Sequence, residues 1–114
     1  MELMRPIPRI ALVNDGDLLK PKGVDGWGKT TFAEPVRLKY IRVEAVNSRH
    51  FNLSGDLPEI SAVLYYDCVN SLPENTVFDT GDTVRINSRE YKVKTVKEFY
   101  GTSGKIHHLE VELV

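Results

Sequence analysis

Alternation of apolar and polar residues is the dominant pattern in this chain of 114 residues. After Pro35, the apolar residues Val36, Leu38 and Tyr40 alternate with basic residues, and the apolar face then switches between Tyr40 and Ile41. A period of two residues predicts a strand with one buried face. The switch predicts a β-bulge or a sharp bend at this point.

Further strands are predicted where apolar runs lie between turn signals. The segment 17–24 is also extended, but Pro21 cannot donate to a ladder, so this strand is an edge or is irregular. In Tyr65-Tyr66, one ring is expected in the core and the other on the outer face. The remaining predicted strands cover residues 59–69, 83–87, 91–99 and 105–114.

No segment shows a convincing helical period, and turns recur at short intervals. These features predict an all-β fold, a small, partly open antiparallel β-barrel of five to seven strands with long loops. We expect one domain over residues 1–114, with residues 1–9 as a flexible N-terminal arm because Pro6 and Pro8 favour extended backbone.

The pairing register of the last two predicted strands, 91–99 and 105–114, can be predicted from their charges and apolar residues. One register places opposite charges on one face and apolar residues on the other, which stabilises a sheet through cross-strand pairs. A bulge is expected near Thr95 and Val96, where the alternation breaks. In this register the residue numbers of each opposed pair add up to 204. The pairs are Lys94–Glu110, Lys92–Glu112, Val93–Val111 and Tyr91–Leu113.

Two adjacent histidines, His107 and His108, lie in the last strand. Neighbouring strand residues point to opposite faces, so the two rings are expected to diverge, one at the end of the core and the other toward solvent or a partner. The remaining histidine, His50, and the single thiol, Cys68, have no ligand spacing. We therefore expect no metal site, and we expect Cys68 to be a small buried residue.

Composition narrows the function classes. The formal net charge of −1 gives no basic excess for general binding to nucleic acid. Residues 1–13 do not resemble a signal peptide, and no apolar run approaches the length of a membrane span. One cysteine in a chain of this size fits a reducing compartment.

Catalytic motifs are missing from the sequence. The stretch Asp25-Gly26-Trp27-Gly28 contains two glycines, but no helix follows to bind phosphate, so it predicts a hairpin turn with an anchoring tryptophan. The carboxylates Asp56, Glu59 and Asp67 are scattered and are expected to be solvated. The chain is therefore not expected to be an enzyme.

Three segments, taken in order, resemble the minor capsid proteins of tailed phages and prophages of Gram-positive bacteria. They are DGWGKTTFAEPVRLKYIRVEA, LYYDCVNSLPENTVFDTGDTVRINSREYKV and HHLEVELV. The resemblance covers roughly residues 10–114. Within this group, the chain is similar to head–tail joining proteins, also called stoppers or connectors.

The resemblance implies a structural protein of the virion without cofactors or catalytic residues. Such a protein would be made in the host cytoplasm and would then form a homo-oligomeric ring at the head–tail interface. There it would contact portal or adaptor and tail proteins and help to retain packaged DNA, which it would contact at most sterically. Isolated, it is expected to be a monomer, with no membrane partner.

In such stoppers one long loop can reach into the channel. The polar segment 47–59 is the candidate here, because a loop of this length in a small domain is more often functional than idle. Its charges nearly cancel, so any closure would be steric. The candidate channel or interface residues are Arg49, His50, Phe51, Asn52 and Leu53.

Two other functions stay open from the sequence. One is a tail terminator or tail-completion protein. The other is a small nucleic-acid-binding β-barrel, which would use lysines of the last hairpin such as Lys92, Lys94 and Lys97, together with stacking aromatic residues. Glu110 and Glu112 are expected to neutralise two of these lysines.

Overall fold

The computed structural model describes residues 5–46 and 60–114. The described residues contain no α-helix, which confirms the predicted all-β class. The elements are one 3-10 turn, η1 (Arg9–Ala11), and the strands β1 (Asn14–Leu19), β2 (Pro21–Val24), β3 (Thr30–Phe32), β4 (Val36–Ala45), β5 (Ala62–Asp67), β6 (Thr83–Ile86), β7 (Arg89–Tyr100) and β8 (Ile106–Leu113).

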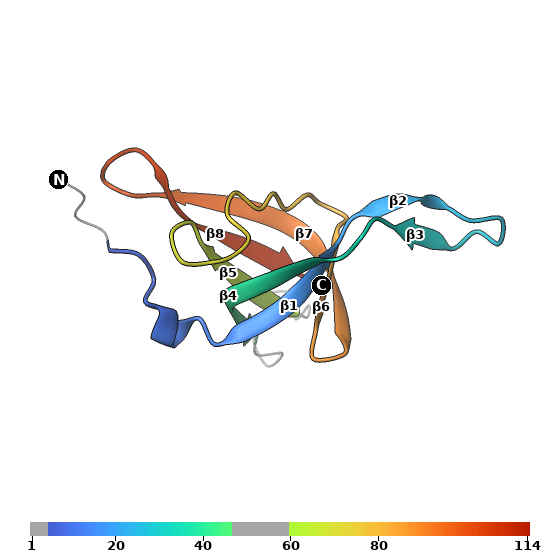
Figure 1. Ribbon diagram of the computed structural model, residues 1–114, viewed down its shortest axis with the longest axis horizontal. Coiled ribbons are helices and arrows are strands. Elements are labelled where there is room, and N and C mark those ends of the chain that lie inside the picture. The colour runs from blue at the N-terminus through green and yellow to red at the C-terminus, as the bar shows by residue number, and fades with distance from the viewer. Residues whose placement is uncertain (1–4, 47–59) are drawn as a thin grey trace, which may run out of the picture.

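Six antiparallel strands form a barrel in the order β1-β4-β5-β8-β7-β6, and β6 pairs back onto β1 (Figure 1). The barrel is therefore closed, and the predicted partial opening is wrong. Gly16 permits closure, because a Cβ atom there would lie 2.9 Å from Ile86 Cγ1 and 3.0 Å from the Arg85 carbonyl oxygen. Closure pairs the strands that would otherwise be exposed edges.

All six strands of the barrel contribute side chains to its core. Tyr66 is buried and packs edge-on against Phe78 at 5.7 Å between ring centroids, whereas Tyr65 faces outward, as predicted. Phe78 comes from the β5–β6 connection, so this connection covers part of the core. The core cluster consists of Leu18, Leu38, Ile41, Ala62, Leu64, Tyr66, Phe78, Val84, Ile86, Val93, Leu109, Val111 and Leu113.

The predicted bend in β4 is confirmed. Tyr40 has a φ angle of +56°, and the β1–β4 register shifts at this point, since Gly16 pairs with Leu38 and Asn14 pairs with Ile41. Leu38 and Ile41 both point into the core as a result. The guanidinium of Arg9 lies 4.7 Å from the centre of the Tyr40 ring and stabilises this unusual residue through a cation–π contact.

The β7–β8 hairpin has a different register from the predicted one. Opposed residue numbers sum to 206 or 207, so the proposed pairs that sum to 204 do not form; the observed ones include Val93–Leu113, Val96–Val111 and Lys97–Glu110. The turn is responsible, because Gly104 adopts a φ angle of +82° and Gly101 N donates to the Lys105 carbonyl oxygen. The predicted bulge is confirmed between Val93 and Thr95.

The first described residues cross the outer surface near the end of β5. Ile7 N donates to Asp67 Oδ1 at 2.9 Å, and Asn70 Nδ2 donates to the Ile7 carbonyl oxygen at 2.8 Å. Asp67 Oδ2 also accepts hydrogen bonds from the backbone of Val69 and Asn70. Asp67 is fully buried, so the expected solvated carboxylate is wrong at this position.

Candidate functional site

The hairpin of β2 and β3 projects beyond the barrel at one end of the long axis (Figure 1). These two strands form their own small sheet and pair with each other from Pro21–Phe32 to Val24–Thr30. Every residue from 21 to 30 is exposed. The segment 17–24 was predicted as one irregular or edge strand, but the structure divides it at Lys20 into the end of β1 and the whole of β2, which begins at Pro21. No residue of this hairpin belongs to the core cluster.

The tip of this hairpin is a tight, hydrogen-bonded turn. Asp25 Oδ1 accepts from the backbone nitrogens of Trp27 and Lys29 at 2.8 and 2.9 Å, and Gly28 adopts a φ angle of +79°. The Trp27 side chain is 91% exposed. The predicted hairpin turn is confirmed, but the tryptophan does not anchor it to its own chain.

Exposure of this side chain has a clear energetic consequence. A tryptophan buries about 150–250 Å² when it is enclosed, and tryptophan is enriched among the residues that dominate protein interfaces. The turn presents Trp27 with its backbone already ordered, so little backbone entropy remains to be lost on binding. The turn therefore holds a large aromatic side chain almost wholly in solvent.

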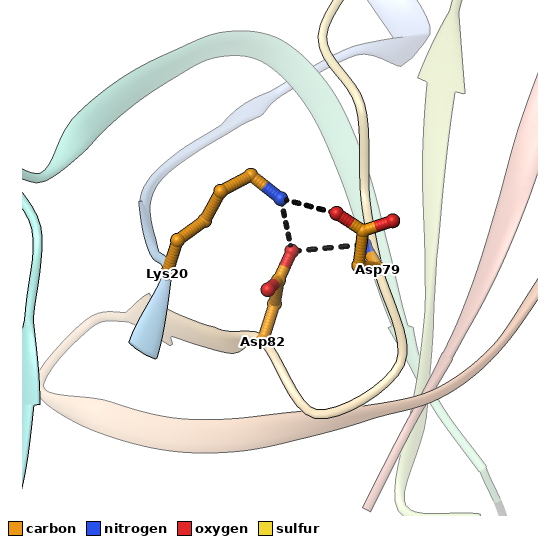
Figure 2. Close-up of polar contacts among 3 residues, drawn as sticks. All are labelled: Lys20, Asp79 and Asp82. Carbon is orange, nitrogen blue, oxygen red and sulfur yellow. Dashed lines mark hydrogen bonds and ion pairs between the residues drawn. The ribbon is translucent and has the colours of Figure 1, made fainter. Parts of the chain in front are cut away.

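The base of the hairpin is fixed to the barrel by an ionic cluster. Lys20 Nζ lies 2.6 Å from Asp82 Oδ2 and 3.0 Å from Asp79 Oδ2, and the Asp82 carboxylate also accepts from Asp79 N (Figure 2). The Asp82 side chain is only 4% exposed, whereas that of Asp79 is 67% exposed. Lys20 is the residue between β1 and β2, so the cluster, here called the brace, sets the direction in which the hairpin leaves the barrel.

Electrostatics keep the brace charged. Burial alone would lower the pKa of Lys20, but the hydrogen bonds and charges of Asp82 and Asp79 together outweigh that effect and raise the pKa above 10.5. The hairpin base also contains a backbone hydrogen bond from Ala33 N to the Lys20 carbonyl oxygen at 2.9 Å. Lys20 thus joins the hairpin base to the barrel through two ionic contacts and one backbone hydrogen bond.

The two adjacent histidines converge, so their predicted divergence is wrong. Their Nδ1 atoms are 2.7 Å apart and the ring planes meet at 84°. The reason is a second register shift, in which Phe99 pairs with His108 and Tyr100 pairs with Ile106, which leaves His107 as an extra residue on β8. A bulge of this kind re-aims a side chain.

Each of the two imidazole rings has a hydrogen-bond partner at its Nε2 atom. His107 Nε2 lies 2.6 Å from the Arg5 carbonyl oxygen, and His108 Nε2 lies 3.0 Å from Glu110 Oε2, so each Nε2 must donate. Within residues 5–46 and 60–114, no three His, Cys, Asp or Glu side chains gather as metal ligands would.

Cys68 is exposed, and its predicted burial is wrong. It follows the last residue of β5, where the chain turns out of the barrel, so the alternation of the strand no longer applies to it. Partial desolvation of the sulfur, and then the charges of Asp67 and Glu98, raise the pKa of the Cys68 thiol above 9.0. A thiol of this kind is a poor nucleophile near neutral pH.

The charge pairs predicted for the last hairpin are replaced by others. Glu112 Oε2 lies 3.6 Å from Lys97 Nζ, and Glu112 also accepts from Thr95 Oγ1. Glu110 contacts His108. The acidic residues of β8 therefore neutralise Lys97 of β7, which the predicted register did not pair with either of them.

The predicted loop residues cannot be compared with this arrangement. Arg49, His50, Phe51, Asn52 and Leu53 lie outside the described residues, as does the rest of 47–59. The exposure of Trp27 and the brace were not predicted from the sequence. An available signal was the run from Pro21 to Lys29, which contains no apolar alternation that could face a core.

Comparison with known proteins identifies the family. A family model described as minor capsid protein matches residues 8–113, which is nearly the whole chain. Searches of curated proteins and of solved structures gave no match. No helix in the described part of the chain is long and apolar enough to cross a membrane. The chain therefore belongs to the minor capsid protein family of phages, whose members are structural components of the virion.

Proposed function

We propose that this protein is a head–tail connector, or stopper, subunit that joins the portal or adaptor to the tail and helps to retain packaged DNA. The observation that carries the proposal is Trp27, presented almost fully exposed on a hairpin that leaves a closed barrel. A barrel with one projecting aromatic arm is suited to contact several proteins at once, because the arm reaches a neighbour while the barrel wall meets another.

Mechanically, the brace is central to this role. Lys20 and Asp82 hold the hairpin at its base, so that a force on the tip is transmitted to the β6 end of the barrel. A joint between head and tail must resist the pressure of packaged DNA. In this proposal the hairpin is the steric element, and the brace is its stiff support.

The test is a Trp27→Ala substitution in a phage or prophage that encodes this protein. We expect filled heads that lack tails, or heads that lose DNA after packaging, in place of infectious particles. Ile10→Ala is the matched control, because Ile10 is also a large apolar residue, is 87% exposed and lies outside the hairpin. Imaging of the neck in wild-type particles should place the protein between portal and tail.

Other results would contradict the proposal. Trp27→Ala particles with normal tails and normal infectivity would exclude a joining role for the hairpin. Filled, stable heads beside tails of abnormal length would indicate a tail terminator or tail-completion protein. Salt-sensitive, micromolar binding of the isolated protein to single-stranded DNA would favour a nucleic-acid-binding barrel.

The segment 47–59 enters the proposal from the sequence alone. As the connection between β4 and β5, it would supply the channel or interface loop of the connector, with Arg49, Phe51 and Leu53 among its contact residues. Shortening the loop should release DNA from filled heads without preventing packaging. Unchanged DNA retention would exclude the channel role.

A further inference from the structure

An apolar hollow of about 270 Å³ lies where the end of β5, the β5–β6 connection and the start of β8 meet. Tyr66 and Leu109 form its floor, and the more exposed Cys68, Val77 and Ile106 form its walls. For comparison, an apolar cavity of about 150 Å³ accommodates benzene. The hollow is therefore large enough for an aromatic side chain.

The hollow and the hairpin lie toward opposite ends of the molecule. The molecule extends 54 Å along its longest axis, and β2 and β3 project at one end of it, whereas the β7–β8 turn, which leads into β8, lies toward the other (Figure 1). Trp27 therefore cannot reach the hollow of its own chain. A second copy could bring the two features together.

Charge favours the same pairing. Lys22 and Lys29 flank the tip of the hairpin and are exposed. Near the hollow, Glu74 precedes the lining residue Asn75 and Glu98 lies opposite Leu109, and these two exposed carboxylates outnumber Lys105, which precedes Ile106. In the arm the two lysines outnumber Asp25, so an arm with a net positive charge would approach a rim with a net negative charge, an arrangement that steers association.

We propose that Trp27 of one copy docks into the hollow formed by Cys68, Val77 and Ile106 of the next copy, so that the protein associates head to tail. Because the two surfaces differ, the contact is heterologous and repeats around a ring when the rotation closes. This inference rests on the proposed connector function and names a second copy of the same chain as the hairpin's partner.

The contact is small. One tryptophan buries about 150–250 Å², whereas a stable protein interface buries about 1,200–2,000 Å² in total. The isolated protein should therefore be largely monomeric, and the ring should form when portal or tail proteins present many copies together. An assay must capture a weak contact at high protein concentration.

Cys68 provides the reporter for that assay. A disulfide requires Cα atoms about 4.4–6.8 Å apart, so its formation reports close approach. Gly26→Cys introduces the second thiol beside Trp27 and keeps the tryptophan, and a Cβ atom at Gly26 has open space around it. The full-length variant is oxidised with copper phenanthroline at about millimolar concentration and separated on a non-reducing gel.

We expect a ladder of dimers, trimers and higher species, because each copy carries one thiol at each end. The ladder should disappear in Gly26→Cys/Cys68→Ser and fall by about tenfold or more in Gly26→Cys/Trp27→Ala, which removes the anchor. Circular dichroism checks that all variants are folded.

Three results would overturn the inference: no ladder for Gly26→Cys, a ladder that Trp27→Ala leaves unchanged, or dimers alone that persist without Cys68. The last would mean that hairpin tips meet each other. These failures are distinct from failure of the connector function. A missing ladder together with tailless Trp27→Ala particles would leave the connector role standing and assign the hairpin to another virion protein.

Discussion

Removal of the Asp82 carboxylate is the sharpest test of how the hairpin is held. Asp82 Oδ2 accepts two hydrogen bonds, from Lys20 Nζ at 2.6 Å and from Asp79 N at 2.8 Å (Figure 2). In Asp82→Ala both donors lose this acceptor, and the turn that leads into β6 loses a support. The matched control is Asp79→Ala, which removes the other carboxylate from the same lysine.

The magnitude follows from burial. A hydrogen bond to a charged group contributes about 1.5–3 kcal/mol, and a neutral one about 1 kcal/mol. The Lys20 side chain is 36% exposed and keeps Asp79, so its share is discounted toward the surface value of about 0.2–1 kcal/mol. The Asp79 amide adds about 1–2 kcal/mol if it is left unsatisfied. We therefore expect Asp82→Ala to lower the free energy of unfolding by about 2 kcal/mol.

Asp79→Ala should cost less than about 0.5 kcal/mol, because its carboxylate is 67% exposed. Urea denaturation measures both values from the shift in midpoint at constant slope. Amide exchange of Ala33, whose nitrogen donates to the Lys20 carbonyl oxygen, reports the hairpin base and should accelerate in Asp82→Ala alone.

The pH dependence provides an internal check. Lys20 has a raised pKa, so its contribution to stability is fully present below pH 10.5 and is lost as the pH rises through the folded-state value. The difference between wild type and Asp82→Ala should therefore shrink in that alkaline range. Equal losses in Asp79→Ala and Asp82→Ala, or no loss in either, would refute the reasoning from burial.

Three further predictions concern other parts of the chain. Gly16→Ala should lower stability by about 1–3 kcal/mol in urea denaturation, because its Cβ would meet the β6 backbone, whereas Gly26→Ala, with open space, should not destabilise the protein; equal effects would exclude close packing as the reason for Gly16. Trp27→Ala should change stability by less than about 0.5 kcal/mol, and a larger loss would show that the ring supports its own fold. Cys68 should react slowly with iodoacetamide below pH 9.0 and accelerate above it, because its pKa is raised; rapid alkylation at pH 7 would contradict this.

Local patterns predicted the features that depend on local backbone geometry. The six strand residues from Val36 to Ile41 contain the switch of the apolar face, and the positive φ angle of Tyr40 is its structural outcome. The outward Tyr65 and inward Tyr66 follow from the same alternation. These features need only the two-residue period of a strand and the requirement that one face be buried.

Features that depend on distant contacts were not predictable in this way. Barrel closure requires β6 to approach Gly16, about seventy residues earlier in the chain. The histidine contact requires a bulge whose position is set by the β7–β8 turn. Charge pairing favoured a register that the turn geometry does not permit, since several registers place lysine opposite glutamate and only the loop discriminates among them.

The exposure of Trp27 depends both on local sequence and on contacts between residues that are distant in sequence. The turn around it is local and was predicted, but its solvent exposure depends on where the hairpin leaves the barrel, and the brace decides that. A loose hairpin would lose orientational entropy whenever its tip docked, and a single tryptophan contributes too little to offset a large loss. The Lys20–Asp82 contact therefore lowers the entropy cost of docking Trp27, which is itself a weak contact. Asp82→Ala should accordingly reduce the Gly26→Cys ladder, although Asp82 lies far from the tip. A ladder unaffected by Asp82→Ala would mean that the tip docks without help from its base.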